Sequence, residues 1–261
     1  MRTRNFSALS LLLLLLSSLL AVVQAKLEKV GLPSDASVPA AVRSALDPSG
    51  ALLVRADGSV LCEIWLRQAP LPAGKVAAAK GATYPELSPG MFVGLISFPN
   101  GGKDFRGQPV KGYFTMRYAL LPEDGNHLGV APTRDFVLLS RASDDGDPGG
   151  PFDYARLVKL SAQAAGTNHP AAFLLLAPDN NPTLSPQDNN PTLSPPKAGG
   201  DKGGATKDNG GTTGGDKGGP TITEPRTYQN ADSYQVFAGT VRTDGGKSVP
   251  IALVVKGQAE Q

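Results

Sequence analysis

The stretch Gly112-Tyr-Phe-Thr-Met-Arg-Tyr-Ala-Leu-Leu121 shows the pattern that decides the fold class. Large apolar side chains occupy every second position: Phe114, Met116, Tyr118 and Leu120. The positions between them hold Tyr113, Thr115 and Arg117. Because successive side chains of a strand point to opposite faces, this alternation predicts a β-strand with one buried face.

Seven further segments have the composition of strands: residues 51–55, 59–66, 91–98, 134–140, 171–177, 234–242 and 249–255. Helices are predicted at 38–46, with Ser37 as the cap, and at 151–165, where an apolar stripe ends at Gly166. The pattern therefore predicts a mainly β protein. We expect a single β-sandwich or jelly-roll-like domain with one or two short helices.

Residues 178–225 differ in composition from the rest of the chain. They contain 10 Gly and 8 Pro in 48 residues, about 38%, whereas roughly 25–30% already indicates disorder in a non-periodic segment. The sequence Asp179–Pro186 recurs unchanged at 188–195. We expect a disordered low-complexity insertion within one domain. Residues 26–177 form its first part, and a C-terminal β-hairpin in residues 226–258 completes it.

Residues 1–25 have the organisation of a secretory signal peptide. Arg2 and Arg4 precede an apolar run that ends in Val-Gln-Ala25, with small or short residues where a signal peptidase cuts. Two serines interrupt the run, which is also short for a membrane span. We predict cleavage after Ala25, a periplasmic or secreted location, and no membrane span in the remaining chain.

The charge balance of the chain argues against one class of function. The whole chain is +2 at pH 7, and losing the two arginines of residues 1–25 leaves 23 basic and 23 acidic residues. A neutral chain without a basic cluster does not predict nucleic-acid binding.

Cys62 has no internal partner, and we expect a buried, unreactive thiol. Gly-x-Ser-x-Gly, phosphate-loop and dinucleotide-binding motifs are absent from the sequence, so whether the protein is an enzyme stays open.

Aromatic and charged side chains on two predicted strands form a first candidate site, for a ligand. Trp65 and Glu63 share one face of a strand, and Tyr113 and Arg117 share one face of another. Exposed aromatic rings beside a few polar groups are typical of sugar-binding surfaces. The alternative is that Trp65 closes the core or lies beneath a helix.

Two histidines in matching contexts form a second candidate site, for a divalent metal ion. His127 and His169 both follow Asn and both precede a predicted strand, so they could meet at one end of the sandwich. Glu123, Asp124 or Asp135 would complete the ligand set. The usual metal-binding spacings of histidine are missing. The alternative is a turn at Asp124 whose neighbours bond the loop backbone, in which case no cofactor is expected.

Several stretches carry a family resemblance: Pro-Glu-Asp-Gly-Asn-His-Leu-Gly-Val within residues 105–136, Thr-Asn-His-Pro within 166–170, Tyr-Pro-Glu-Leu at 84–87, and Leu-Val-Val-Lys-Gly at 253–257. Together they resemble an uncharacterised family of predicted exported bacterial proteins that has no assigned activity. The resemblance covers most of the chain outside 178–225. It implies an exported bacterial protein and assigns no catalytic residue.

These observations lead to two hypotheses. The first is an exported, non-catalytic β-sandwich protein that binds a glycan, an envelope component or a partner protein. The second is a metal-binding protein or metal-dependent enzyme that uses His127 and His169.

Overall fold

The computed structural model describes residues 25–68, 81–122, 131–150, 152–178, 224–242 and 248–257. The predicted signal peptide up to residue 24 and nearly all of the predicted insertion lie outside the described residues. In the described ranges the strands are β1 Lys26–Val30, β2 Gly50–Val54, β3 Val60–Leu66, β4 Phe92–Lys103, β5 Pro109–Leu120, β6 Asp135–Arg141, β7 Ala172–Leu176, β8 Arg226–Gln229, β9 Gln235–Arg242 and β10 Ser248–Lys256. The helices there are α2 Ala40–Ser44, the 3-10 helix η1 Ala142–Asp144 and α3 Tyr154–Ala165. The prediction of a mainly β protein is confirmed.

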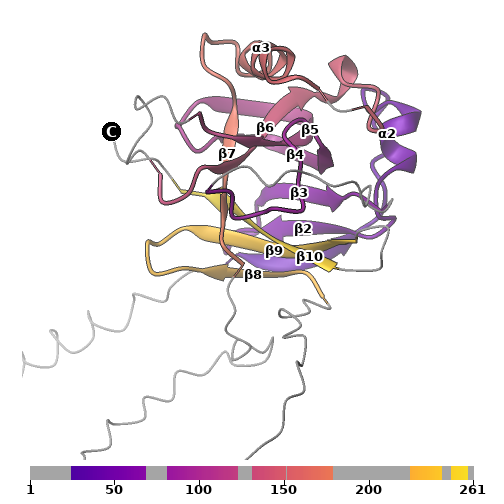
Figure 1. Ribbon diagram of the computed structural model, residues 1–261. Helices are drawn as coiled ribbons and strands as arrows, with labels where there is room; N and C mark the ends of the chain where they lie inside the picture. Colours follow the sequence, from indigo (N-terminus) through magenta and orange to yellow (C-terminus); the bar gives the residue numbers. More distant parts are fainter. Residues whose placement is uncertain are drawn as a thin grey trace, which may run out of the picture.

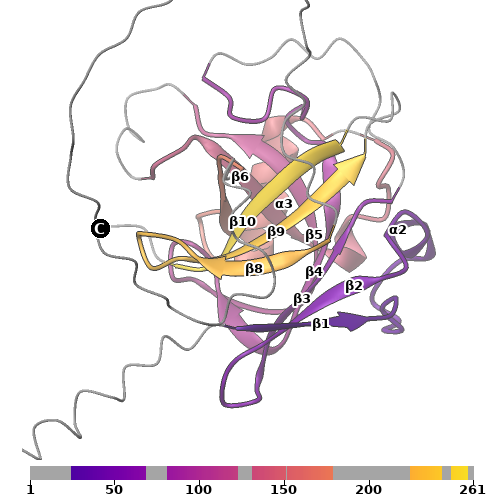
Figure 2. The ribbon, with the colours of Figure 1, turned by 90° about the horizontal axis from the view of Figure 1, so that it is seen from below.

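The described strands form one antiparallel sheet that is nearly closed into a barrel (Figure 1). Neighbours follow the chain order from β1 to β7, and the order then reverses to β10, β9 and β8. The two edge strands, β1 and β8, lie close together (Figure 2). Lys29 Nζ of β1 is 3.9 Å from Glu224 Oε2, just before β8. The expected sandwich or jelly roll is not confirmed, because pairing runs through a single sheet.

The barrel interior is a core of large apolar side chains. From β5 it receives Phe114, Met116 and Tyr118, the apolar face predicted by the alternation in residues 112–121. The ring of Phe98 stacks on that of Phe173, with 5.5 Å between centroids. These side chains fill the described interior of the barrel. Burial of aromatic rings of this size contributes strongly to the stability of a core.

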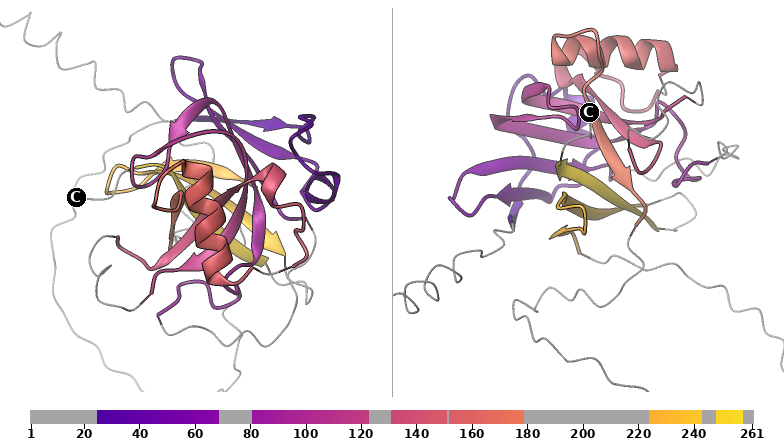
Figure 3. Two further views of the ribbon diagram at one scale, coloured as in Figure 1. Left: turned by 90° about the horizontal axis from the view of Figure 1, so that it is seen from above. Right: turned by 90° about the vertical axis from the view of Figure 1, so that its left-hand side faces the viewer.

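Helix α3 covers the outer face of the sheet over β5 and β6 (Figure 3). The carboxylate of Asp153 accepts a hydrogen bond from Arg156 N at 2.8 Å and caps the first turn. Gly166 ends the helix with φ 68°, a left-handed conformation that glycine adopts without strain. Leu157 packs into the apolar cluster beneath the helix. The predicted helix and its stop at Gly166 are confirmed.

Helix α2 covers a second part of the outer face, beside β3 and β4. Val42 packs in a cluster with Trp65 and Phe92. The helix has only five residues, and it starts after Pro39 without a side-chain cap. The predicted cap at Ser37 is therefore wrong: proline fixes the backbone at the helix start, and Ser37 N instead donates to Asp35 Oδ1.

The segment before β4 closes one end of the barrel. Tyr84 lies in the interior, where its hydroxyl donates to Leu176 O at 2.5 Å and accepts from Ala252 N at 3.1 Å. The buried carboxylate of Asp135 accepts bonds from the backbone of Thr83 and from the hydroxyl of Tyr118. None of the described helices is long and apolar enough to cross a membrane.

Candidate functional site

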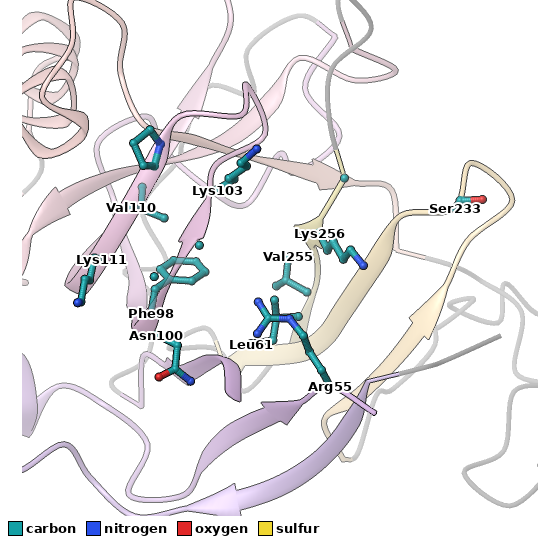
Figure 4. A pocket seen from close by; sticks show the side chains of 14 residues that line it. Arg55, Leu61, Phe98, Asn100, Lys103, Val110, Lys111, Ser233, Val255 and Lys256 are labelled. Carbon is teal, nitrogen blue, oxygen red and sulfur yellow. The ribbon is translucent and has the colours of Figure 1, made fainter. Parts of the chain in front are cut away.

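The other end of the barrel is open and holds a pocket of about 810 Å³ (Figure 4). Its walls come from the β2–β3 hairpin, the end of β4, the start of β5, the β8–β9 turn and the end of β10. Because neighbouring strands are antiparallel, these ends meet at one rim of the sheet. The pocket is therefore assembled from segments that are far apart in the sequence.

The floor of the pocket is apolar and belongs to the barrel interior. Leu61, Phe98, Val110 and Val255 form it, and all four are part of the interior core. A Cβ at Gly102 would lie 2.6 Å from Phe98 Cδ1, so the absence of a side chain lets the ring lie against the backbone. The stacking on the interior rings fixes the orientation of Phe98. An entering ligand thus meets a rigid apolar surface.

The rim of the pocket is cationic. Arg55, Lys103, Lys111 and Lys256 all line it, and no described lining residue is Asp or Glu. Figure 4 shows Lys103 and Lys111 on the side of Phe98, with Arg55 and Lys256 across the opening. The three lysines are exposed and Arg55 is half-buried. We call these four residues the cationic rim.

Arg55 is held in place by its own hairpin. Its Nη1 donates to Ser59 Oγ at 3.1 Å and to the carbonyl of Val60 at 3.0 Å. Ser59 in turn donates to Asp57, and these bonds hold the pKa of that carboxyl below its ordinary value. Both bonds of Arg55 leave from one nitrogen, so the opposite edge of the guanidinium can meet a ligand.

Trp65 does not form the exposed platform expected from the sequence. Its side chain is 1% exposed, and Nε1 donates to Gly31 O at 2.9 Å. A Cβ at Gly50 would lie 2.3 Å from that nitrogen, so the indole presses on the neighbouring backbone. The expectation of an exposed ring is wrong because α2 covers this part of the outer face. The alternative, a tryptophan beneath a helix, describes its position.

The structure brings Glu63 and Tyr113 together beside Trp65, whose ring centroid is 6.4 Å from that of Tyr113, but it buries Arg117 in a separate ion pair. Glu63 and Tyr113 are half-buried and flank Ser97 across three strands, away from the pocket. Burial raises the pKa of the Tyr113 hydroxyl. Arg117 is fully buried and forms an ion pair with Asp145, with Nε 2.6 Å from Oδ2. Arg117 is therefore a structural residue in this fold and cannot reach a ligand.

The predicted metal site is only partly within the described chain. Glu123, Asp124 and His127 lie outside the described residues. His169 is exposed, three residues before Ala172 at the start of β7, and Ala172 pairs with Leu138. Asp135 lies at the opposite end of β6, where its oxygens accept bonds from protein donors. The structure thus does not bring Asp135 and His169 together, and no three His, Cys, Asp or Glu of the described ranges are placed to hold a metal ion.

Cys62 is buried in β3, as the sequence predicts. Burial raises the pKa of its thiol well above the ordinary value, so the thiol stays protonated. No residue of the cationic rim was identified from the sequence. Each is an isolated basic residue, and only strand pairing brings them to one opening.

Comparison of the chain with protein-family models, curated proteins and solved structures found no match. The resemblance to exported bacterial proteins therefore stays a prediction from short motifs. Because a fold alone does not fix a function, the functional argument rests on the chemistry of the pocket.

Proposed function

We propose that this protein is an exported, non-catalytic binding protein that takes a small ligand into the open mouth of its barrel. The observation that carries the proposal is the pocket of about 810 Å³ whose floor is the barrel interior. Small-molecule sites have volumes of roughly 300–1,000 Å³, are mostly apolar, and occur in the mouths of β-barrels. Export to the periplasm or the medium rests on the composition of residues 1–25.

The lining supplies groups for recognition. Contact between the apolar floor and an apolar ligand surface favours binding, because both surfaces leave water. Asn100 and the cationic rim add hydrogen-bond donors around the opening. The glycan hypothesis depended on an exposed Trp65 and loses that support. Among the partners expected from the sequence, an envelope component small enough to enter the mouth fits the pocket best.

The test uses N-phenyl-1-naphthylamine, a small uncharged apolar dye whose fluorescence rises when it leaves water. We expect saturable binding to the purified protein at one site. Replacing Asn100→Trp places a large ring at the opening and should raise the dissociation constant at least about tenfold, because one wall of the pocket is then occupied. Asn100 is exposed, so its replacement is expected to leave the circular dichroism spectrum unchanged.

The matched control is Tyr154→Ala on α3, where an aromatic ring is 43% exposed on another part of the surface. Its dissociation constant should stay within about twofold of the parent protein, a change worth less than about 0.5 kcal/mol. If Asn100→Trp leaves dye binding unchanged and Tyr154→Ala abolishes it, the ligand site does not lie at the mouth. Failure of the dye to saturate any site would contradict the proposal.

A further inference from the structure

Positive charge gathers at the barrel mouth from four separate segments. Arg55 follows β2, Lys103 ends β4, Lys111 lies in β5 and Lys256 ends β10. The chain without residues 1–25 carries equal numbers of basic and acidic residues, so the mouth is a local excess of positive charge. No ion pair between described residues involves any of these four groups. A concave site lined by one sign of charge concentrates ligands of the opposite sign.

The four cations differ in burial and in hydrogen bonding, and this difference divides their roles. Arg55 is half-buried and fixed by its bonds to Ser59 and Val60, so it presents one edge of its guanidinium in a constant position. Figure 4 shows it reaching toward the floor residues Leu61 and Val255. The three lysines are exposed and flexible, and they can turn toward an anion wherever it sits at the rim. A single anionic group can therefore be held by one fixed cation and by several mobile ones.

The apolar floor lies directly beside this charge. Phe98 and Val110 line the same pocket as Lys103 and Lys111, on neighbouring strands. On its inner side the ring of Phe98 stacks on that of Phe173, an interior residue that does not line the pocket. A simple anion such as phosphate would use the rim and leave the floor wet. A neutral apolar molecule would use the floor and leave the rim without a partner.

On these grounds we propose that the ligand of the barrel mouth is an anionic amphiphile: one carboxylate, sulfate or phosphate group carried on an apolar chain or ring. The anion binds at the cationic rim, and the apolar part lies on the floor formed by Leu61, Phe98, Val110 and Val255. This inference rests on the proposed function and names its ligand class. The same chemistry has two sources, a free amphiphile in solution and the headgroup of a lipid in a membrane. The pocket, which is concave and of limited volume, favours the free molecule.

The experiment displaces bound N-phenyl-1-naphthylamine with three amphiphiles that share a twelve-carbon chain. They are dodecanoate, dodecyl maltoside and dodecyltrimethylammonium, each used below its micellar concentration. We expect dodecanoate to displace the dye at concentrations at least about tenfold lower than the other two, because a charge-assisted hydrogen bond contributes about that factor. We also expect the preference to shrink as NaCl is raised, since salt screens exposed lysines.

Charge variants test the rim itself. The double variant Lys103→Gln and Lys111→Gln should raise the dissociation constant of dodecanoate at least about tenfold while leaving that of the uncharged dye within about twofold. Arg55→Gln should act in the same direction. The matched control, Lys29→Gln with Lys159→Gln, removes two exposed lysines elsewhere and should change neither constant. All four lysines are exposed, so these variants are expected to fold.

The outcomes separate the two proposals. Absence of dye binding removes the proposed function itself. Dye binding with equal displacement by all three amphiphiles, or with no effect of the rim variants, keeps a ligand-binding mouth and overturns the anionic amphiphile. Sedimentation with vesicles of phosphatidylglycerol and phosphatidylcholine provides the last arm. If the protein binds these vesicles through Lys103 and Lys111 while free dodecanoate fails to displace the dye, the source is a membrane surface and the free ligand is overturned.

Discussion

Replacing Arg117 should destabilise the protein more than any other change of a single charged side chain in the described part of the sheet. The guanidinium lies on the outer face of β5 and is 0% exposed. Nε and Nη2 donate to the two oxygens of Asp145 at 2.6 and 2.7 Å. Nη1 donates to Gly90 O and Gly150 O, both at 2.7 Å, and Nη2 also donates to Asp147 O at 2.6 Å. Every N–H of the group is used, which ties the loop before α3 to the sheet.

The size of the effect follows from what each variant leaves behind. Arg117→Met removes the charge and leaves Asp145 buried, with Thr115 Oγ1 at 2.7 Å as its remaining side-chain donor. Removing one partner of a buried ion pair costs about 3–5 kcal/mol. Arg117→Lys keeps the charge but supplies three donors in place of five, so two acceptors lose their bonds. At about 1 kcal/mol or more for each buried acceptor, the cost is about 2–3 kcal/mol. The expected order of stability is parent, lysine variant, methionine variant.

The measurement is urea unfolding followed by circular dichroism, with thermal unfolding as a second readout. A loss of 3–5 kcal/mol corresponds to a fall in Tm of about 6–20 °C for a domain of this size. Arg156→Met is the matched control: Arg117 and Arg156 both lie over the Phe152 ring, with Cζ 3.8 and 4.0 Å from its centroid, but Arg156 is exposed. Its cost should stay below about 1 kcal/mol. If Arg117→Met costs no more than Arg156→Met, the loop does not depend on the buried ion pair and the reasoning is refuted.

Three further predictions concern the core, one glycine and metal content. Burial raises the pKa of Cys62, so Ellman's reagent at pH 8 should modify this thiol only after unfolding, and rapid labelling of the folded protein would show it accessible. In urea unfolding, Gly90→Ala should lower the free energy of unfolding by at least about 2 kcal/mol more than Gly58→Ala. Both glycines have positive φ, so the backbone cost is shared. A Cβ at Gly90, however, would lie 2.0 Å from a backbone oxygen, whereas Gly58 faces open space. Equal costs would contradict that clash. Chelator should leave Tm unchanged, because Asp135 is already bonded to protein donors; near-stoichiometric metal lost on His127→Ala would contradict this expectation and support the metal hypothesis.

Local patterns predicted individual elements well. The alternation in residues 112–121 identified the strand and its interior face, and Gly166 marked the end of α3. Two short edge strands, Lys26–Val30 and Arg226–Gln229, were missed because they are largely polar and gain their pairing from a neighbour. The helix predicted at 38–46 has only five residues in the structure, and Pro39 sets its start.

Closure of the sheet could not be predicted in the same way. Alternation shows which face of a strand is buried, but both a sandwich and a barrel bury one face. The distinction depends on which strands pair, and the decisive pairing joins Leu176 of β7 to Ala252 of β10, across residues 178–225. No local pattern encodes a contact over that separation.

The candidate site was beyond sequence reasoning for the same reason. Trp65 and Arg117 stood out as chemically distinctive residues, and both serve the packing of the outer face. The residues that line the mouth are common ones, such as Lys103 and Val110, and they gain meaning only from their shared position. The chemically distinctive residues therefore serve packing, whereas the pocket on which the proposed function rests is lined by common residue types.

Strand β7 gives the barrel a particular order of assembly. It has five residues, and among the described strands it is the one of the first seven that pairs with one of the last three. Synthesis starts at the N-terminus, so the first seven strands can pair before β10 has been made. Their inner side chains, Phe173 among them, stay open to water until β10 docks. Pairings over long separations form slowly. The sheet therefore stays open, with apolar side chains in contact with water, until the residues of β10 have been added.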